Sequence, residues 1–335
     1  MADKKNGFIL PLVVILIFSI SALLIRLMTR ATMLAPLERM ALEREQAKQL
    51  AMMGITLVQA QLALPMKEEK EKQDFYKQLL SLLNHWQTFN LKEDVDGIEG
   101  KIDLYVSSEN GKIPLNALWR FKEKKFVAPP QGVDVKKLLA NVLFAGKGSQ
   151  KEQPVTERLE AFLKKQEQPL EDLTQVWADK DFNALAVHWF PPREVEKEQE
   201  SGAIYFGDFF TVAHDDTKLQ PPFFSAAVQQ MLGMKPVEDK EKYNEGIKKL
   251  AEGLKEKVTW QQQWDPLLGQ LYGVTYAKLP EDAKKLFSDQ VGASLISVVS
   301  YGNIGTITQK VFAFLAQTVD ADGTVRYVIR KLYWL

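Results

Sequence analysis

FILPLVVILIFSISALLI, residues Phe8–Ile25, is a run of eighteen residues without a charge, and the interpretation of the rest of the chain depends on it. MADKKNG precedes the run and Arg26 closes it. An uncharged stretch of this length can cross a bilayer as a helix, whereas the apolar part of a signal peptide usually has about 7–15 residues. A single N-terminal transmembrane helix is therefore predicted. A cleaved signal peptide, with serines shortly before Ala22, is the alternative.

A short basic leader joins the apolar run. Lys4 and Lys5 are followed by Asn6 and Gly7, and the run begins at Phe8. This junction resembles the prepilin-type leader of type IV pilins and type II secretion pseudopilins, in which a prepilin peptidase cuts after the glycine on the cytoplasmic side. The resemblance implies a leader at residues 1–7, cleavage between Gly7 and Phe8, and methylation of the new N-terminus.

Leu12 is the fifth residue after the predicted cleavage site, where most pilins and pseudopilins carry glutamate. In a packed filament that carboxylate would pair with the amino terminus of a neighbour, because an unpaired charge in an apolar environment is costly. Its absence is characteristic of the minor pseudopilin K of type II secretion systems, which is proposed to sit at the pseudopilus tip. The N-terminus thus resembles that of the general secretion pathway protein K family.

Composition excludes several classes of function. The 335 residues carry 43 basic and 43 acidic side chains, so the formal net charge is zero and a non-specific nucleic-acid binder is disfavoured. The chain has no cysteine, which excludes disulfides, thiolate nucleophiles and cysteine-ligated metals. Basic residues flank the span on both sides, at Lys4, Lys5, Arg26 and Arg30, so charge does not orient it. The resemblance of residues 1–7 to a prepilin leader implies that the bulk of the chain lies in the periplasm.

The helix is predicted to continue from the span to about Leu64, as a spine over residues 8–64. Apolar residues recur there at three- and four-residue spacing. The residues that we predict to face a partner helix are Leu50, Gly54, Leu57 and Val58. Pro36 is expected to bend or interrupt the helix and Pro65 to end it. Unbroken, the spine would be about 85 Å long; an anchor followed by a separate helix is the alternative.

Residues 65–118 are predicted to form the first part of a pilin-like domain. A helix from Lys67 to about Phe89 precedes a strand around Ile102–Val106, and Glu109-Asn110-Gly111 reads as a hairpin turn. The sequence ENGKIPLNAL, residues 109–118, resembles the strand-turn-helix motif of pseudopilin K proteins, with Pro114 in place of the first asparagine of that motif.

Residues 119–290 read mostly as helices, and residues 291–335 as a β meander. The expected helices cover Val155–Lys165, Leu170–Trp177, Ser225–Leu232, Glu241–Lys257 and Glu281–Phe287. The expected strands cover Ser294–Tyr301, Thr306–Ala316 and Thr324–Trp334, with turns at Gly302-Asn303 and Asp322-Gly323. In the K family a helical domain is inserted into the pilin-like fold, and LEDL at residues 170–173 and FFTV at residues 209–212 resemble its edges.

The predicted fold class is therefore α+β: a pilin-like long N-terminal helix packed on an antiparallel sheet, with a large inserted α-helical domain. If the strands around Ile102 and after Ser294 share one sheet, the helical region between them is an insertion.

The sequence offers few candidates for catalytic or metal-binding residues. The histidines His85, His188 and His214 are too scattered for a metal site defined by spacing, and His214-Asp215-Asp216 reads as a solvated turn. Some pseudopilin K relatives bind calcium through acidic loops. Here Lys92 occupies the first ligand position of a possible EF-type loop around Asp94 and Asp96, and the turn with Asp320 and Asp322 fails similarly. A calcium site assembled from several loops stays open, and no cofactor is assigned.

The favoured function is that of a non-enzymatic minor pseudopilin, as the resemblance implies. Its partners would be other minor pseudopilins in a heterotrimeric tip complex, the prepilin peptidase and the inner-membrane secretion platform. Its location would be the bacterial inner membrane, with a single span and the bulk in the periplasm. The alternatives are a minor subunit of a type IV or DNA-uptake pilus, and a membrane-anchored periplasmic enzyme.

Overall fold

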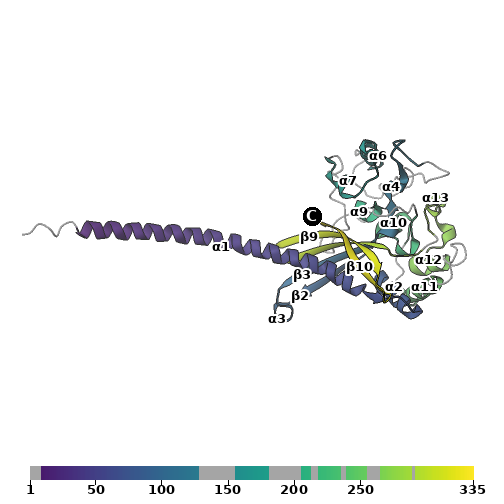
Figure 1. Cartoon of the computed structure of the whole chain (residues 1–335), viewed down its shortest axis with the longest axis horizontal. Coiled ribbons are helices and arrows are strands. Elements are labelled where there is room, and N and C mark those ends of the chain that lie inside the picture. Colours follow the sequence, from purple (N-terminus) through teal and green to yellow (C-terminus); the bar gives the residue numbers. More distant parts are fainter. Residues whose placement is uncertain are drawn as a thin grey trace, which may run out of the picture.

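One long helix projects from a folded head in the computed structural model (Figure 1). The structure describes residues 9–127, 155–180, 205–212, 218–234, 239–254, 265–288 and 291–335. The helix α1 (Ile9–Gln61) has 53 residues, about 80 Å at 1.5 Å per residue. It passes through Pro36 without a break, so the alternative of an anchor and a separate helix is wrong. Strong helix formers on both sides of Pro36 offset the single hydrogen bond that a proline removes.

The head is built on a six-stranded antiparallel sheet in the order β1-β10-β9-β8-β3-β2. The strands are β1 (Leu64–Pro65), β2 (Trp86–Leu91), β3 (Gly100–Ser108), β8 (Leu295–Ile304), β9 (Ile307–Val319) and β10 (Thr324–Trp334). Strands β3 and β8 are direct neighbours, with Tyr105 opposite Val299. This pairing confirms that two stretches far apart in the sequence share one sheet.

The three C-terminal strands were predicted close to their observed limits, but one of their turns was not. Gly323 has a φ of 81° in the turn between β9 and β10, as expected. The other turn is centred on Gly305, with a φ of 53°, and Gly302 and Asn303 lie inside β8. Glycine is required at position 302 for another reason. A Cβ atom there would lie 2.0 Å from the carbonyl oxygen of Ala47 in α1.

Helix α2 (Glu69–Leu82) is shorter than predicted. It buries Phe75, Leu79 and Leu82, and it ends before Trp86, which belongs to β2. Asn84 has a φ of 65°, a conformation that asparagine tolerates better than most residues, and it turns the chain from the helix into the strand.

The chain between β3 and β8 is mostly helical where it is described. Its helices are α4 (Leu115–Leu118), α6 (Val155–Lys165), α7 (Thr174–Ala178), α9 (Phe206–Phe209), α10 (Ala226–Met231), α11 (Lys240–Gly253), α12 (Asp265–Tyr272) and α13 (Glu281–Lys284). Two short strands, β4 (Ile113–Pro114) and β7 (Phe210–Thr211), pair in parallel. The hairpin of β5 (Trp119–Arg120) and β6 (Lys125–Phe126) lies at the start of this region. We call the part of the chain from α4 to α13 the insert.

Helix α1 covers one face of the sheet, along β8 and β9. The buried side chains of its second half, which are Ala47, Leu50, Ala51, Ile55, Val58 and Leu62, belong to the main hydrophobic core. Gly54 brings the helix close to the sheet, because a Cβ atom there would lie 2.2 Å from Ser300 Oγ. The opposite face carries a separate cluster of Tyr105, Val299, Phe312 and Phe314.

Candidate functional site

The first half of α1 has no partner within the described part of the chain. From Leu12 to Leu42 the apolar side chains are exposed, and Phe18 reaches 72%. Of the helices that the structure describes, this one is long and apolar enough to cross a membrane. Leu12 lies in this exposed segment, whereas the predicted processing residues, Gly7 and Phe8, precede the described residues. Exposed apolar surface of this extent requires a lipid or protein environment.

The four residues predicted to face a partner helix lie on the inner side of α1. Leu50 and Val58 are buried in the head's own core, Gly54 fits against Ser300 and Leu104, and Leu57 is half-buried beside the core. An apolar stripe at helical spacing predicts which side of a helix is buried, but it does not identify the surface that covers that side. Here the covering surface is the protein's own sheet.

A different set of residues forms the side of α1 that is open to a neighbour. Leu42, Gln49, Met53, Thr56 and Ala60 recur at three-, four- and seven-residue spacing and are exposed, with Leu42 at 60% and Met53 at 48%. We call them the outer face of α1. None of these five side chains carries a charge, so a second helix can pack on them without burying an ion.

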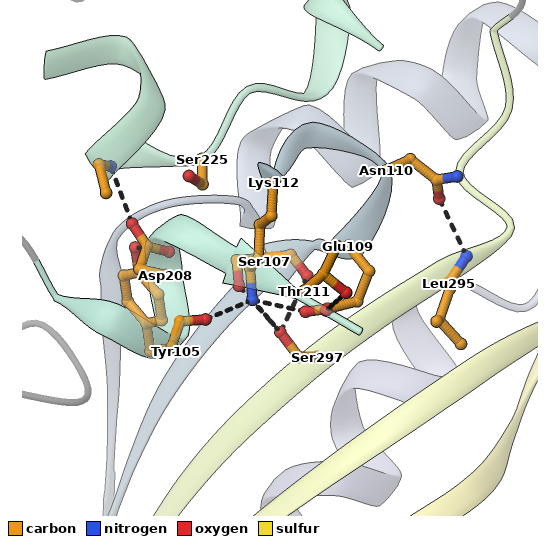
Figure 2. A network of polar contacts seen from close by, with 12 residues as sticks. Tyr105, Ser107, Glu109, Asn110, Lys112, Asp208, Thr211, Ser225, Leu295 and Ser297 are labelled. Atoms are coloured by element: carbon orange, nitrogen blue, oxygen red, sulfur yellow. Dashed lines mark hydrogen bonds and ion pairs between the residues drawn. The ribbon is translucent and has the colours of Figure 1, made fainter. Parts of the chain in front are cut away.

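A buried polar junction joins the sheet to the insert (Figure 2). Its centre is Lys112, which is 1% exposed and directly follows a short 3-10 turn, Glu109–Gly111. The Lys112 Nζ atom donates hydrogen bonds to Glu109 Oε1 at 2.5 Å, to the carbonyl oxygen of Gly207 at 2.8 Å and to Ser297 Oγ at 2.9 Å. All three ammonium hydrogens therefore have acceptors, from the turn, the insert and β8.

Two carboxylates complete the junction. The second oxygen of Glu109, Oε2, accepts a hydrogen bond from Thr211 Oγ1 at 2.5 Å. Asp208 accepts one from the Tyr105 hydroxyl at 3.0 Å and one from the backbone N–H of Ala227 at 2.9 Å. Burial raises the pKa of Asp208 above its usual 3.8, although the nearby Lys112 ammonium lowers it in part. Burial beside this carboxylate also holds the pKa of the Tyr105 hydroxyl well above 10.

The turn at Glu109–Gly111 is buried, so its interpretation as a hairpin tip is wrong. Asn110 Oδ1 accepts a hydrogen bond from the backbone N–H of Leu295, and the Asn110 carbonyl accepts one from Gln220. Gly111 packs so closely on the insert that a Cβ atom would lie 1.7 Å from the carbonyl oxygen of Phe223. Sequence analysis missed this junction, although a Glu and a Lys three residues apart between two apolar segments were its visible signal.

The remaining titratable candidates do not converge on a reaction centre within the described residues. His85 Nδ1 is 2.9 Å from the carbonyl oxygen of Leu83, whereas His188 and the cluster at His214 lie outside the described residues. Asp96 and Asp322 accept hydrogen bonds from backbone N–H groups of their own turns. Across the described ranges, no group of three or more His, Cys, Asp or Glu side chains could hold a metal ion.

The comparisons with known proteins gave similarities to solved structures alone. No protein-family model matches the chain, and no curated protein matches it. Among solved structures, a chain of the GspK-GspI-GspJ complex from the type 2 secretion system of enterotoxigenic Escherichia coli is similar. The similarity covers 89% of this chain and 99% of that chain, with 11% sequence identity and a TM-score of 0.45.

Proposed function

We propose that this chain is a non-enzymatic minor pseudopilin of a type II secretion system. The observation that carries the proposal is helix α1, whose second half packs on the head's own sheet while its first half exposes apolar side chains throughout. A helix divided in this way fits a subunit that stands in the inner membrane and packs its helix beside those of its neighbours. The leader at Lys4–Phe8, Leu12 and the sequence ENGKIPLNAL supply the resemblance to the pseudopilin K family.

The same features support a proposed orientation in the membrane and a proposed position in the filament. The prepilin peptidase would cut after Gly7 at the cytoplasmic side, and the head would then lie in the periplasm. Leu12 offers no carboxylate to pair with the amino terminus of an incoming subunit. The insert lies on the head at the end away from the N-terminus of α1 (Figure 1), where it would obstruct a further subunit. Both features support a place at the pseudopilus tip, where the chain would initiate assembly on the secretion platform.

The outer face of α1 is the surface on which we place the contact with two other minor pseudopilins. Its uncharged side chains, with Met53 near the middle, can meet the corresponding helices of those subunits. A charge buried at the centre of such a contact would be costly without a partner. Met53→Glu is therefore expected to weaken the complex, whereas Val319→Glu, on an exposed valine next to the β9–β10 turn, should leave it intact.

Two measurements test the proposal. Mass spectrometry of the protein from its host should find an N-terminal Phe8. Coexpression of the full chain with the other pseudopilins encoded beside it should yield a 1:1:1 complex in detergent. An intact Met1, cleavage near Ser21, or a chain that stays alone with every co-encoded subunit would contradict the proposal. A DNA-uptake defect in the deletion strain with normal protein secretion would point instead to a pilus subunit.

A further inference from the structure

The two edges of the main sheet differ in how they are protected. Strand β10 is covered by β1 over only two residues, and beyond them the side-chain amide of Gln59 in α1 donates a hydrogen bond to the carbonyl oxygen of Tyr327 at 2.7 Å. A register shift interrupts β10 between Ile329 and Lys331, and Arg326 and Arg330 are exposed along it. Bulges, charged side chains and short covering strands are the means by which proteins block unwanted strand pairing at an edge.

Strand β2 forms the other edge, and within the described residues it has no bulge, no charged side chain and no covering strand. Its register against β3 is continuous, from Trp86 opposite Tyr105 to Leu91 opposite Gly100. Its sequence, WQTFNL, contains no charge and no proline, and Thr88 and Asn90 are exposed. No strand within the described ranges lies on its free side. A regular, uncharged edge of this kind is a template for a further strand.

The side chains of β2 also present two surfaces that an added strand would extend. Phe89 and Leu91 are half-buried against the main core on the α1 side of the sheet. Trp86 lies on the other side, with its ring centroid 5.5 Å from that of Tyr105 and 5.3 Å from that of Tyr301. A strand paired with β2 would place alternate side chains beside these two groups.

The charge at one end of this edge specifies the occupant further. Helix α3 (Glu93–Asp96) follows β2 directly and is acidic, Glu99 lies just beyond it, and Val95 is 77% exposed. Lys92 is the basic residue between β2 and this helix. An added strand that extended to the Leu91 end of β2 would come near α3, where a lysine or arginine would be favoured and a carboxylate repelled.

We propose that the free edge of β2 accepts a β-strand from one of the partner subunits in the tip complex. The incoming strand is uncharged along β2 and carries a basic residue beside α3. This inference rests on the proposed function, because the partner is a subunit of the same assembly. It adds a second contact to the helix packing, and backbone hydrogen bonds along β2 would fix the rotation of one head against the next.

Hydrogen–deuterium exchange on the full chain tests the proposal, in detergent, alone and in the complex with its co-encoded subunits. The β2 amides that point away from β3 are expected to exchange at least ten-fold more slowly in the complex, while the amides of residues 326–334 exchange equally in both samples. If the complex forms and the β2 amides exchange equally in both samples, the strand contact is wrong and the proposed function stands. If no complex forms with any co-encoded subunit, both are wrong.

Site-directed cross-linking gives an independent test, because the chain has no cysteine of its own. Asn90→Cys labelled with a photoreactive maleimide should cross-link to a strand of a partner subunit in the assembled complex. Val328→Cys, on the protected edge, is the matched control and should not. Asn90→Lys should weaken assembly at least ten-fold and Asn90→Gln should not. Equal cross-linking from both cysteines, or normal assembly of Asn90→Lys, would overturn the proposal.

Discussion

Lys112 holds the buried polar junction together, because it is the cation among two buried carboxylates. Ionised groups are costly to bury, and the cost is offset only when each finds a partner and its remaining hydrogen bonds are made. Glu109 and Lys112 meet both conditions through Thr211, Gly207 and Ser297. The pair is therefore accommodated in the core while both members are present, and removing one of them destabilises the fold.

Replacing Lys112 by methionine should destabilise the protein strongly. The change takes the Lys112 cation away from the buried Glu109 carboxylate, and breaking a buried ion pair in this way typically costs about 3–5 kcal/mol. Urea unfolding of the full chain in detergent measures the loss. The double variant Glu109→Gln/Lys112→Met retains an acceptor for Thr211 but no charge, so it should be more stable than the single variant. Equal stability of the single and double variants would contradict this account.

Asp208 should make the stability depend on pH in an unusual direction. Its pKa is raised by burial above the usual 3.8, so the folded protein binds this proton more tightly than the unfolded chain does. The contribution is fully present below the unfolded pKa and is lost as the pH rises through the folded pKa. The free energy of unfolding of the wild type minus that of Asp208→Asn should therefore fall as the pH rises above about 4, the ordinary pKa of an aspartate in an unfolded chain. If this difference stays constant or increases with pH, the pKa of the Asp208 carboxyl group is not raised in the folded protein.

Gly111 should tolerate no side chain. A Cβ atom at this position would meet backbone atoms of Phe223, which cannot move aside, so Gly111→Ala is expected to cost about 3 kcal/mol or more. Gly269 in α12 is the matched control, because its Cβ would meet nothing within 4 Å. Gly269→Ala should stabilise the protein by about 0.5–1 kcal/mol. Thermal unfolding of both variants measures the contrast, and similar melting temperatures would refute it.

At the scale of the elements, periodicity predicted which positions of α1 are buried but not what buries them. Leu50, Gly54 and Val58 are buried as the periodicity indicated, but β8 and β9, two of the strands that cover them, lie more than two hundred residues further along the chain. The turn at Gly302 was mislocated for a related reason. That glycine is needed where α1 crosses β8, a close approach that turn propensities do not describe.

A charge introduced on the buried side of α1 should disrupt folding, whereas a charge introduced on its outer face should disrupt only assembly. Val58 is fully buried, and an unpaired carboxylate there must be desolvated, so Val58→Glu should unfold the head. Met53→Glu places the same charge in an exposed position and should leave the unfolding midpoint within a few degrees of the wild type. Circular dichroism during heating distinguishes the two. If Met53→Glu unfolds the head as Val58→Glu does, the assignment of the two sides is wrong.

At the scale of the whole molecule, local signals were enough for the C-terminal meander and insufficient for strand β2 and for the buried polar junction. Dense β-branched and aromatic residues with Asp322-Gly323 predicted the C-terminal meander, because both signals act over a few residues. Glu109 and Thr211 are separated by 102 residues, and Tyr105 and Asp208 by 103. No periodicity records such a pairing. The turn at Glu109–Gly111 was accordingly judged by its local residues, and it was placed at the surface.

The direct pairing of β3 with β8 has a consequence for how such chains can vary over evolution. The long segment between Asn110 and Leu295, which we call the excursion, begins and ends at residues joined by a hydrogen bond. Strands β3 and β8 can therefore pair whatever residues the excursion contains. Each doubling of its length would cost only about 0.6 kcal/mol in loop-closure entropy. A homologue with a much shorter excursion would lack Gly207, Asp208 and Thr211. The Glu109–Lys112 pair would then lose its hydrogen bonds to Gly207 and Thr211. In an alignment, the length of the excursion should therefore covary with apolar replacements at positions 109 and 112.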